Sequence, residues 1–166
     1  GEDIVPLVTA ELRRRGLEPY ADIVVSCPPY FDLEQYHAGP NDLSMLSSYD
    51  AFVAKYTRIV ANTTQLLRPK RLAIFIVGEL RDKRTHAQLG FHHDTITAFK
   101  SAGCAVHQDA VLTTAAASAP MRATKTMGAG SKLVPTHQNV VVCVKGVGFS
   151  PADARAAGIR ANEESQ

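Results

Sequence analysis

The hydrophobic positions of this chain follow two patterns, one typical of amphipathic helices and one typical of buried strands. Over residues 49–67 the apolar side chains recur at helical spacing, with Ser47 or Ser48 as a candidate cap before them and Pro69 as a stop after them. Two weaker patterns of the same kind, each closed by a glycine, occupy residues 3–16 and 93–101. The sequence therefore predicts three helices in these segments.

Short runs of consecutive apolar residues form the second pattern. They are about as long as a strand, and they lack the polar alternation of a sheet that is exposed on one face. These runs occupy residues 22–27, 71–78, 104–113 and 139–145, the third being the least regular. Strands that alternate with helices favour right-handed crossovers, so we predict an α/β fold whose sheet is mostly parallel and has helices on both faces.

Polar segments fill the remaining chain. Residues 31–48 are predicted to form a long functional loop and residues 114–136 a flexible loop, while the tail after residue 146 has a short helix at most. Ligands of open α/β sheets gather at the carboxyl ends of the strands. The loop that follows residue 27 lies at such an end, which makes it the first candidate site.

Composition limits the class of protein. The chain has 166 residues, 45% of them hydrophobic and 20% charged, as expected of one domain with an ordinary core. A net charge of +2 does not by itself require a nucleic-acid partner. No CxxC pair, leader or membrane-length apolar run occurs, so we expect a soluble cytoplasmic protein with reduced thiols. Its cysteines are Cys27, Cys104 and Cys143.

The candidate site is the sequence Ser26-Cys27-Pro28-Pro29-Tyr30, which ends the first predicted strand. Methylation of an exocyclic amino group on a base is difficult, because the nitrogen lone pair is delocalised into the ring. Two acceptors, one a side chain and one a backbone carbonyl, would direct that lone pair at a methyl donor, and a proline pair would hold the carbonyl rigidly. An aromatic residue after the prolines offers a stacking face for a flipped base.

Pro-Pro-Tyr alone is only moderately specific, because it also occurs in unstructured ligands of polyproline-binding domains, and a rigid turn is the simplest alternative. In context, however, the motif resembles that of S-adenosylmethionine-dependent DNA amino-methyltransferases, which act on adenine N6 or cytosine N4. The resemblance is greatest to phage-encoded members in which Ser-Cys-Pro-Pro-Tyr continues as Asp-Leu-Glu-x-Tyr. It covers residues 20–146 and includes residues 75–83 and 136–142.

This resemblance implies a Rossmann-like methyltransferase domain over residues 1–146 and a polar tail over residues 147–166. The reaction would transfer methyl from S-adenosylmethionine to the amino group of a flipped DNA base, with adenine N6 preferred and cytosine N4 as the alternative. The corresponding cell would be bacterial or phage-infected. Two further classes stay open: a methyltransferase-fold module that binds nucleic acid without catalysis, and an enzyme acting on RNA or another amino group.

The resemblance also assigns roles to residues. Pro28 would contribute the backbone carbonyl and Tyr30 the stacking ring, while Cys27 would take the place of the acceptor and contact the donor. A thiol is a weak acceptor, so Ser26 is a substitute for that hydrogen bond. Cysteine nucleophilic chemistry, as in C5-methylation, is the less favoured alternative because no partner base is identifiable.

The family's glycine-rich donor loop is not evident in this sequence. Gly146-Val147-Gly148 follows a strand, but a turn is the simpler interpretation. The first residues resemble the family's Gly-Asp-Ser stretch, so Glu2 and Asp3 are candidate contacts to the donor's adenine. We therefore expect the first strands and the glycine loop to come from an N-terminal segment or a partner chain.

Other polar residues carry weaker expectations. Arg122, Lys125 and Lys132 either follow DNA phosphates or belong to a solvated loop. Asp32 and Glu34 either orient the catalytic loop or solvate it. We expect no metal site, because the nearest cluster consists of surface or helix-capping residues. That cluster is His86, His92, His93 and Asp94. The aromatic stripe over residues 49–56 should pack in the core.

Overall fold

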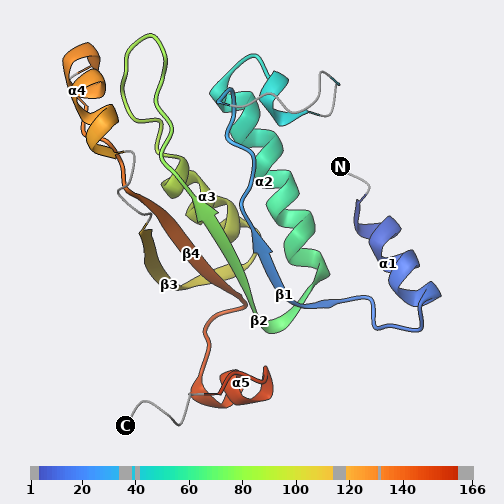
Figure 1. Ribbon diagram of the computed structural model, residues 1–166. Helices are drawn as coiled ribbons and strands as arrows, with labels where there is room; N and C mark the ends of the chain where they lie inside the picture. Colours follow the sequence, from blue (N-terminus) through green and yellow to red (C-terminus); the bar gives the residue numbers. More distant parts are fainter. Residues whose placement is uncertain (1–3, 34–38, 40–41, 114–118, 131, 161–166) are drawn as a thin grey trace, which may run out of the picture.

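The computed structural model has mixed α/β architecture (Figure 1). It describes residues 4–33, 39, 42–113, 119–130 and 132–160. The strands are β1 (Ala21–Ser26), β2 (Leu67–Val77), β3 (Cys104–Thr113) and β4 (His137–Lys145). The helices are α1 (Ile4–Arg14), a 3-10 turn (Leu43–Met45), α2 (Tyr49–Leu66), α3 (Phe91–Ser101), α4 (Ala119–Gly130) and α5 (Pro151–Ala156).

The four strands form one sheet in the order β1-β2-β4-β3. β1 pairs with β2 in parallel, whereas β4 runs antiparallel to both β2 and β3. The expectation of a mostly parallel sheet is therefore not confirmed: two of the three described pairings are antiparallel, because the single reversed strand lies between two others. A strand's apolar pattern does not contain its direction, so the sequence could not reveal this reversal.

The core lies between one face of the sheet, here called the inner face, and helices α2 and α3. Ser48 caps α2 by accepting a hydrogen bond from the Ala51 N–H at 3.2 Å. Below the cap, the rings of Phe52 and Tyr56 stack at 5.8 Å, and both contact Phe91 at the start of α3. The predicted aromatic stripe of α2 is thus confirmed as core packing.

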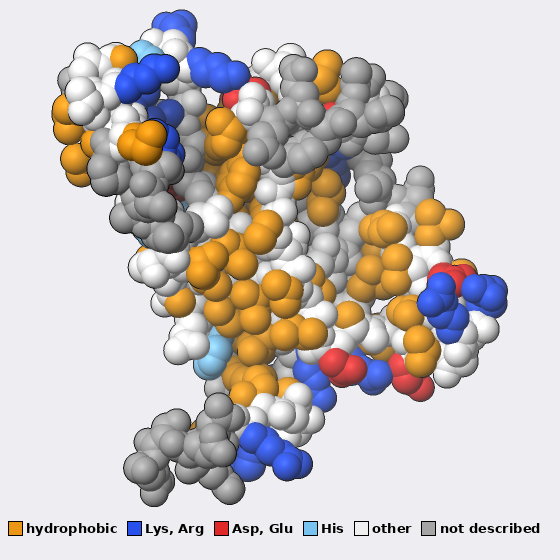
Figure 2. Space-filling view, in the orientation of Figure 1, with side chains coloured by type: hydrophobic (Ala, Val, Ile, Leu, Met, Phe, Trp, Pro, Cys, Tyr) orange, Lys and Arg blue, Asp and Glu red, His pale blue; other side chains and the backbone are white. Residues whose placement is uncertain are grey.

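Helices on both faces were expected, but the described residues do not bear this out. α2 and α3 pack against each other and lie on the same side of the sheet (Figure 1). On the opposite side, here called the outer face, Ile23 is 54% exposed and Val25 61% exposed. Figure 2 shows a continuous apolar patch over the region of β1, β2 and β4.

The prediction of a loop over residues 114–136 is wrong where the structure describes it, because residues 119–130 form α4. Alanine, methionine, lysine and arginine are strong helix formers, and Pro120 stands in the first turn, where proline is tolerated. The glycines and serines around this segment obscured the helical signal. α4 projects from the domain beside the β2–α3 connection (Figure 1).

The tail after β4 contains a short helix, as expected. Ser150 and Asp153 form a capping box at the start of α5, in which each side chain bonds to the other's backbone N–H. Arg71 donates to the Ala156 carbonyl at 3.2 Å, and this bond ties α5 to β2. No helix among the described residues is long and apolar enough to cross a bilayer.

Candidate active site

The Ser26–Tyr30 segment leaves the sheet where β1 ends, beside the end of β2. Ser26 is the last residue of β1 and is half-buried. Cys27 is an exposed free thiol, whereas Pro28 is buried. The two prolines cannot donate to a ladder, so the chain turns away from the sheet here with its dihedral angles restricted. The segment is consequently a stiff loop at a strand end.

Tyr30 fixes this loop to two distant segments. Its hydroxyl oxygen accepts a hydrogen bond from the Gly78 N–H at 3.0 Å and another from Gln138 Nε2 at 2.8 Å. Its ring meets Phe91 edge to face, with centroids 6.0 Å apart. A Cβ added at Gly78 would stand 3.6 Å from the Tyr30 hydroxyl, an ordinary van der Waals contact, so Gly78 and Tyr30 are close neighbours here.

The chain after Tyr30 turns back at once. The Leu33 N–H donates to the Tyr30 carbonyl at 2.9 Å, and Phe31 adopts a positive φ of 21°. The Phe31 ring packs on Phe52 at 5.6 Å, which holds the turn on the core. Asp32 forms an ion pair with Lys83 at 2.7 Å, and the same ammonium donates to the Asp32 carbonyl at 3.2 Å, contacts that the orienting role requires. Glu34 lies outside the described residues.

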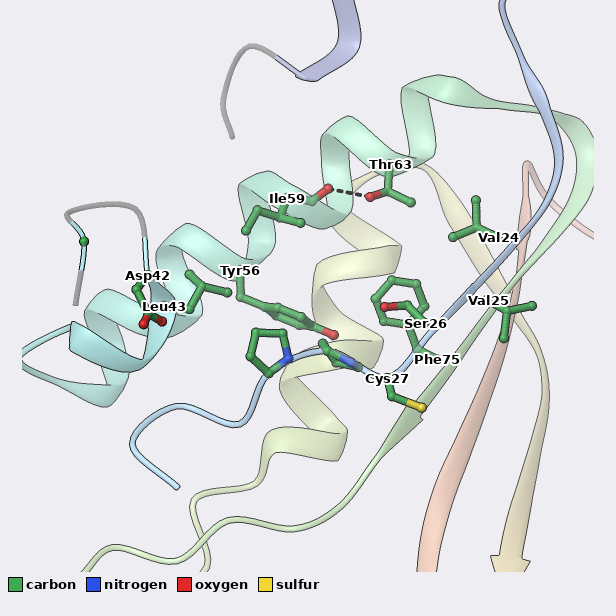
Figure 3. Close-up of a pocket in the computed structure, with 13 residues that line it drawn as sticks. Val24, Val25, Ser26, Cys27, Asp42, Leu43, Tyr56, Ile59, Thr63 and Phe75 are labelled. Carbon is green, nitrogen blue, oxygen red and sulfur yellow. Dashed lines mark hydrogen bonds between the residues drawn. The ribbon is translucent and has the colours of Figure 1, made fainter. Parts of the chain in front are cut away.

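A cavity of about 1020 Å³ opens beside the loop (Figure 3). β1 and the proline loop form one wall, and α2 with the 3-10 turn forms the other. The described residues that line it are Val24, Val25, Ser26, Cys27, Pro28, Pro29, Gly39, Asp42, Leu43, Tyr56, Ile59, Thr63 and Phe75. Ser26, Asp42 and Thr63 contribute polar groups to this lining, whereas Val24, Ile59 and Phe75 contribute apolar ones.

Three of these lining side chains are titratable: Cys27, Asp42 and Tyr56. Burial raises the pKa of Tyr56 well above its usual range, although its hydrogen bond with Thr95 at 3.2 Å acts in the opposite direction. Tyr56 is therefore a neutral hydroxyl at physiological pH. Asp42 accepts from both the backbone N–H and the hydroxyl of Ser44, so it is held in place at the mouth of the cavity.

The candidate phosphate contacts lie on two neighbouring segments. Arg122 and Lys125 are exposed on α4. Lys132, which follows α4, places its Nζ 3.2 Å from His86 Nδ1 in the β2–α3 connection, which also carries Lys83. Basic side chains gather over α4 and this connection in Figure 2. The structure thus brings Lys132 to the connection whose Lys83 contacts Asp32, two residues after Tyr30.

The other candidate site residues either make contacts within the fold or lie outside the described residues. His92 Nε2 lies 3.3 Å from the Asp109 carboxylate, and Asp94 accepts a hydrogen bond from the Tyr49 hydroxyl at 2.6 Å. No group of three or more metal-ligating side chains occurs among the described residues. Glu2 and Asp3 lie outside the part of the chain that the structure describes.

Sequence reasoning missed three residues that build this site: Gly78, Lys83 and Gln138. Each lies in a stretch already singled out for its family resemblance, over residues 75–83 and 136–142, yet no local pattern connects it with Tyr30 or Asp32. The Tyr30–Gln138 bond spans 108 positions. A polar residue at the start of an apolar strand, as Gln138 is, was the available signal.

Comparisons with known proteins add the following. No protein-family model matches the chain, and no curated protein matches its sequence. The fold is similar to that of a Thermus thermophilus protein provisionally assigned as a DNA modification methylase. The TM-score is 0.56 at 20% identity, over 86% of this chain and 54% of that one. A complex of the same protein with S-adenosyl-L-methionine gives 0.53 at 16% identity, over 86% and 48%.

At such low identity these matches show the fold and nothing finer. The chain spans about half the length of the T. thermophilus protein that it matches. It therefore has a mixed α/β fold like that of about half of that protein.

Proposed function

We propose that this chain is the catalytic part of an S-adenosylmethionine-dependent DNA methyltransferase that modifies the exocyclic amino group of a base. The observation that carries the proposal is the rigid Cys27–Tyr30 loop at the carboxyl end of β1, in a fold similar to that of a DNA modification methylase. Residues 1–146 form the catalytic domain and residues 147–166 its tail. The Ser-Cys-Pro-Pro-Tyr sequence supports kinship with the phage-encoded members.

The reaction requires acceptors for the amino hydrogens. The Pro28 carbonyl is one, held by a proline pair and by burial of the Pro28 ring. Ser26 or Cys27 provides the second, and the hydroxyl of Ser26 is the stronger acceptor of the two. Together they draw the nitrogen toward tetrahedral geometry and aim its lone pair at the methyl group. Adenine N6 is the preferred target and cytosine N4 the alternative.

Tyr30 contributes its ring to the flipped base. Its hydroxyl is engaged by Gly78 and Gln138 and part of its ring by Phe91, so the base stacks on the remaining surface of the ring. A ring fixed at its hydroxyl end loses little conformational freedom when a base arrives. Base–aromatic stacking contributes about 1–3 kcal/mol in single-strand binding, so removing the ring should weaken binding about 5- to 150-fold.

The methyl donor fits these residues only in part. S-adenosylmethionine, when bound, supplies the methyl group that the base receives. This chain would contact the donor in the cavity, through polar lining residues such as Ser26 and Asp42. Glu2 and Asp3 are proposed contacts to the donor's adenine. No glycine-rich turn among the described residues lines the cavity, where Gly39 is the one described glycine. An N-terminal segment or a partner chain supplies that turn.

DNA approaches over the basic side chains of α4 and the β2–α3 connection. Arg122 and Lys125 contact phosphates from α4, and Lys132 does so from the segment bonded to His86. Each phosphate neutralised releases counterions, so binding should weaken steeply with salt. This surface adjoins the catalytic loop through the Lys83–Asp32 ion pair.

One observation favours a second candidate. The donor's glycine-rich turn is missing from the described residues, as expected of a module that binds nucleic acid without catalysing transfer. Methylation of RNA or of another amino group is the remaining alternative from the same loop chemistry. Binding of the methyl donor would distinguish an enzyme from a non-catalytic module. The choice of substrate would distinguish a DNA methyltransferase from one that acts on RNA or another amino group.

The test measures transfer of radiolabelled methyl to DNA and RNA oligomers, with calorimetry for donor binding, on this chain and on any longer protein that contains it. We expect transfer to DNA, with at least tenfold loss in Pro28→Ala and in Tyr30→Ala. Lys100→Ala, an exposed lysine in the last turn of α3, is the control and should keep full activity. Donor binding without transfer to any nucleic acid would contradict the proposal, and transfer to RNA alone would replace it.

A further inference from the structure

A second pocket lies between α1 and the last turn of α2, two helices that contact each other (Figure 1). Its volume is about 380 Å³, within the range of roughly 300–1,000 Å³ that is typical of small-molecule sites. The described residues that line it are Val5, Thr9, Arg13, Pro19, Tyr20, Gln65, Leu66 and Lys145. None of them lines the cavity beside the proline loop, so the two hollows are distinct.

The length of α2 places this pocket far from the proline loop. Tyr49, the first residue of α2, contacts the Phe31 ring with centroids 5.9 Å apart. The helix has 18 residues and is therefore about 27 Å long. Leu66, its last residue, lines the pocket. A ligand in this pocket would consequently lie at the end of α2 that is remote from the candidate active site.

One wall of the pocket is a single face of α1. Val5, Thr9 and Arg13 are spaced four residues apart, which places their side chains in a row along the helix. Lys145, the last residue of β4, also lines the pocket. The described residues of the lining thus include two cationic side chains and no acidic one. Such a lining favours an anionic ligand.

Arg13 differs from the two arginines that follow it. Arg14 and Arg15 both bind the Glu11 carboxylate, each at 2.7 Å. The Arg13 side chain forms no ion pair or hydrogen bond with any other described residue. Arg13 is exposed, so its guanidinium keeps all five N–H donors for solvent or for a ligand.

Lys145 removes an electrostatic obstacle to an anion at this place. The last carbonyls of a helix carry a partial negative charge, which would repel an anion near the end of α2. The Lys145 ammonium donates to the Leu67 carbonyl at 2.6 Å and to the Gln65 carbonyl at 3.3 Å. These two bonds offset that charge and leave one of the three ammonium N–H donors for a ligand.

The rest of the lining suits an organic group. Val5, Pro19 and Leu66 are apolar, and Tyr20 adds an aromatic ring. The Arg68 guanidinium lies over the Tyr20 ring, 6.0 Å from its centroid, and this cation–π contact favours one position of the ring. A bare inorganic ion would leave these apolar groups without a contact, whereas an organic anion would cover them.

We infer that this pocket binds a small phosphomonoester, with its phosphate between Arg13 and Lys145 and its organic part against the apolar residues of the lining. A phosphate has three terminal oxygens pointing in different directions, so it can accept hydrogen bonds from donors on separate elements. A carboxylate has only two oxygens in one plane. Arg13 offers a planar fork of donors and Lys145 a point charge, and both are common phosphate ligands. The Thr9 hydroxyl is a further donor on the same face of α1.

Calorimetry with thymidine 5′-monophosphate tests the inference, on this chain and on any longer protein that contains it. This probe carries a phosphate on a planar organic group and lacks the adenine of the proposed methyl donor. We expect one binding site. Thymidine has no phosphate and inorganic phosphate has no organic group, so each should bind at least tenfold more weakly. Added salt should weaken the binding of the probe.

Two substitutions on α1 locate the site. Arg13→Gln removes the unpaired cation and should weaken binding of the probe at least tenfold. Thr9→Glu introduces a carboxylate into the lining and should abolish binding. Both variants should fold, because glutamine and glutamate are good helix formers. Arg14→Gln makes the same change outside the lining, and Thr9→Gln matches the size of glutamate without its charge. Both of these controls should keep most of the affinity.

The inference is overturned if the probe does not bind in the millimolar range, or if thymidine or inorganic phosphate binds as tightly as the probe does. Full binding by both Arg13→Gln and Thr9→Glu would overturn it as well. The proposed function is tested separately, because no described residue of this pocket belongs to the proline loop or its cavity. Probe binding without methyl transfer would contradict the proposed function and leave this site intact.

Discussion

The inner and outer faces of the sheet are built from the same strands and the same kinds of residue, yet most of their side chains differ in environment. Val141 and Cys143 on the inner face have no exposed surface, whereas Ile23 and Val25 on the outer face are more than half exposed. The difference lies in the neighbouring layer, because α2 and α3 cover only one side. A continuous apolar run in a strand therefore does not by itself show that both of its faces are covered within this chain.

The largest effect should come from a large aromatic side chain buried on the inner face. Phe75 is 3% exposed and packs edge to face on Phe99 at 4.9 Å. Phe75→Ala should lower the free energy of unfolding by about 3–5 kcal/mol, because the lost transfer energy adds to the cost of a cavity. Urea unfolding followed by circular dichroism measures it. A loss below about 1 kcal/mol would mean that the inner face is no better packed than the outer one.

Alkaline pH should weaken the same face. Burial raises the pKa of Cys143 to about 12, and it also raises the pKa of Tyr56 above its ordinary value of 10.0. Both groups stay neutral in the folded chain and ionise on unfolding, so their contribution is complete below pH 9 and falls as pH rises. The loss approaches about 1.4 kcal/mol per pH unit for each group.

Urea unfolding at a series of pH values from 8 to 11 measures this slope. Tyr56→Phe should remove the tyrosine's part of it above pH 10 while leaving the part that begins near pH 9. An identical slope in the variant would show that Tyr56 ionises as readily in the folded chain as in the unfolded one.

One substitution made on both faces isolates the effect of burial. Val141→Thr places a hydroxyl among buried apolar groups and should cost about 1–3 kcal/mol. Val25→Thr makes the same change at an exposed position and should stay within about 0.5 kcal/mol. Threonine is β-branched like valine, so strand propensity hardly changes. Equal losses at the two positions would remove the distinction between the faces.

The smallest effect concerns the hydrogen bonds that anchor the Ser26–Tyr30 loop. Tyr30→Phe keeps the ring but removes the acceptor for Gly78 and Gln138, at a cost of about 0.5–1.5 kcal/mol. Hydrogen exchange at the Gly78 amide should accelerate, because its bond to the Tyr30 hydroxyl is lost. Gln138→Leu is the complementary change and leaves the Gly78 bond in place. Unchanged exchange at Gly78 in Tyr30→Phe would contradict the anchoring role.

Much of the local structure was predictable from the sequence. The predicted segments 49–67 and 104–113 correspond to α2 and β3. In the first, apolar side chains recur at helical spacing; the second begins with consecutive apolar residues. α4 was missed because it is exposed on nearly all sides, so no apolar stripe marks it. The reversed direction of β4 was not predictable, because the same residues suit either direction.

In the candidate site, too, the local features were predictable and the contacts between distant residues were not. The Ser26–Tyr30 motif is local, and its position at a strand end followed from the apolar run before it and the prolines within it. The partners of Tyr30 are not local: Gly78 and Gln138 reach it only after the sheet is assembled. Their roles depend on tertiary contacts, which a single sequence does not specify position by position.

The hydrogen bond between Tyr30 and Gln138 also bears on the order of folding. It joins positions 108 residues apart, so the cost of closing that loop must be met before the bond can form. β1, α2 and β2 can associate through nearer contacts, but the proline loop gains its second anchor only when β4 joins the sheet. During synthesis the loop would therefore stay incompletely fixed until residue 138 had emerged, and its rigidity would be among the last properties that the chain acquires.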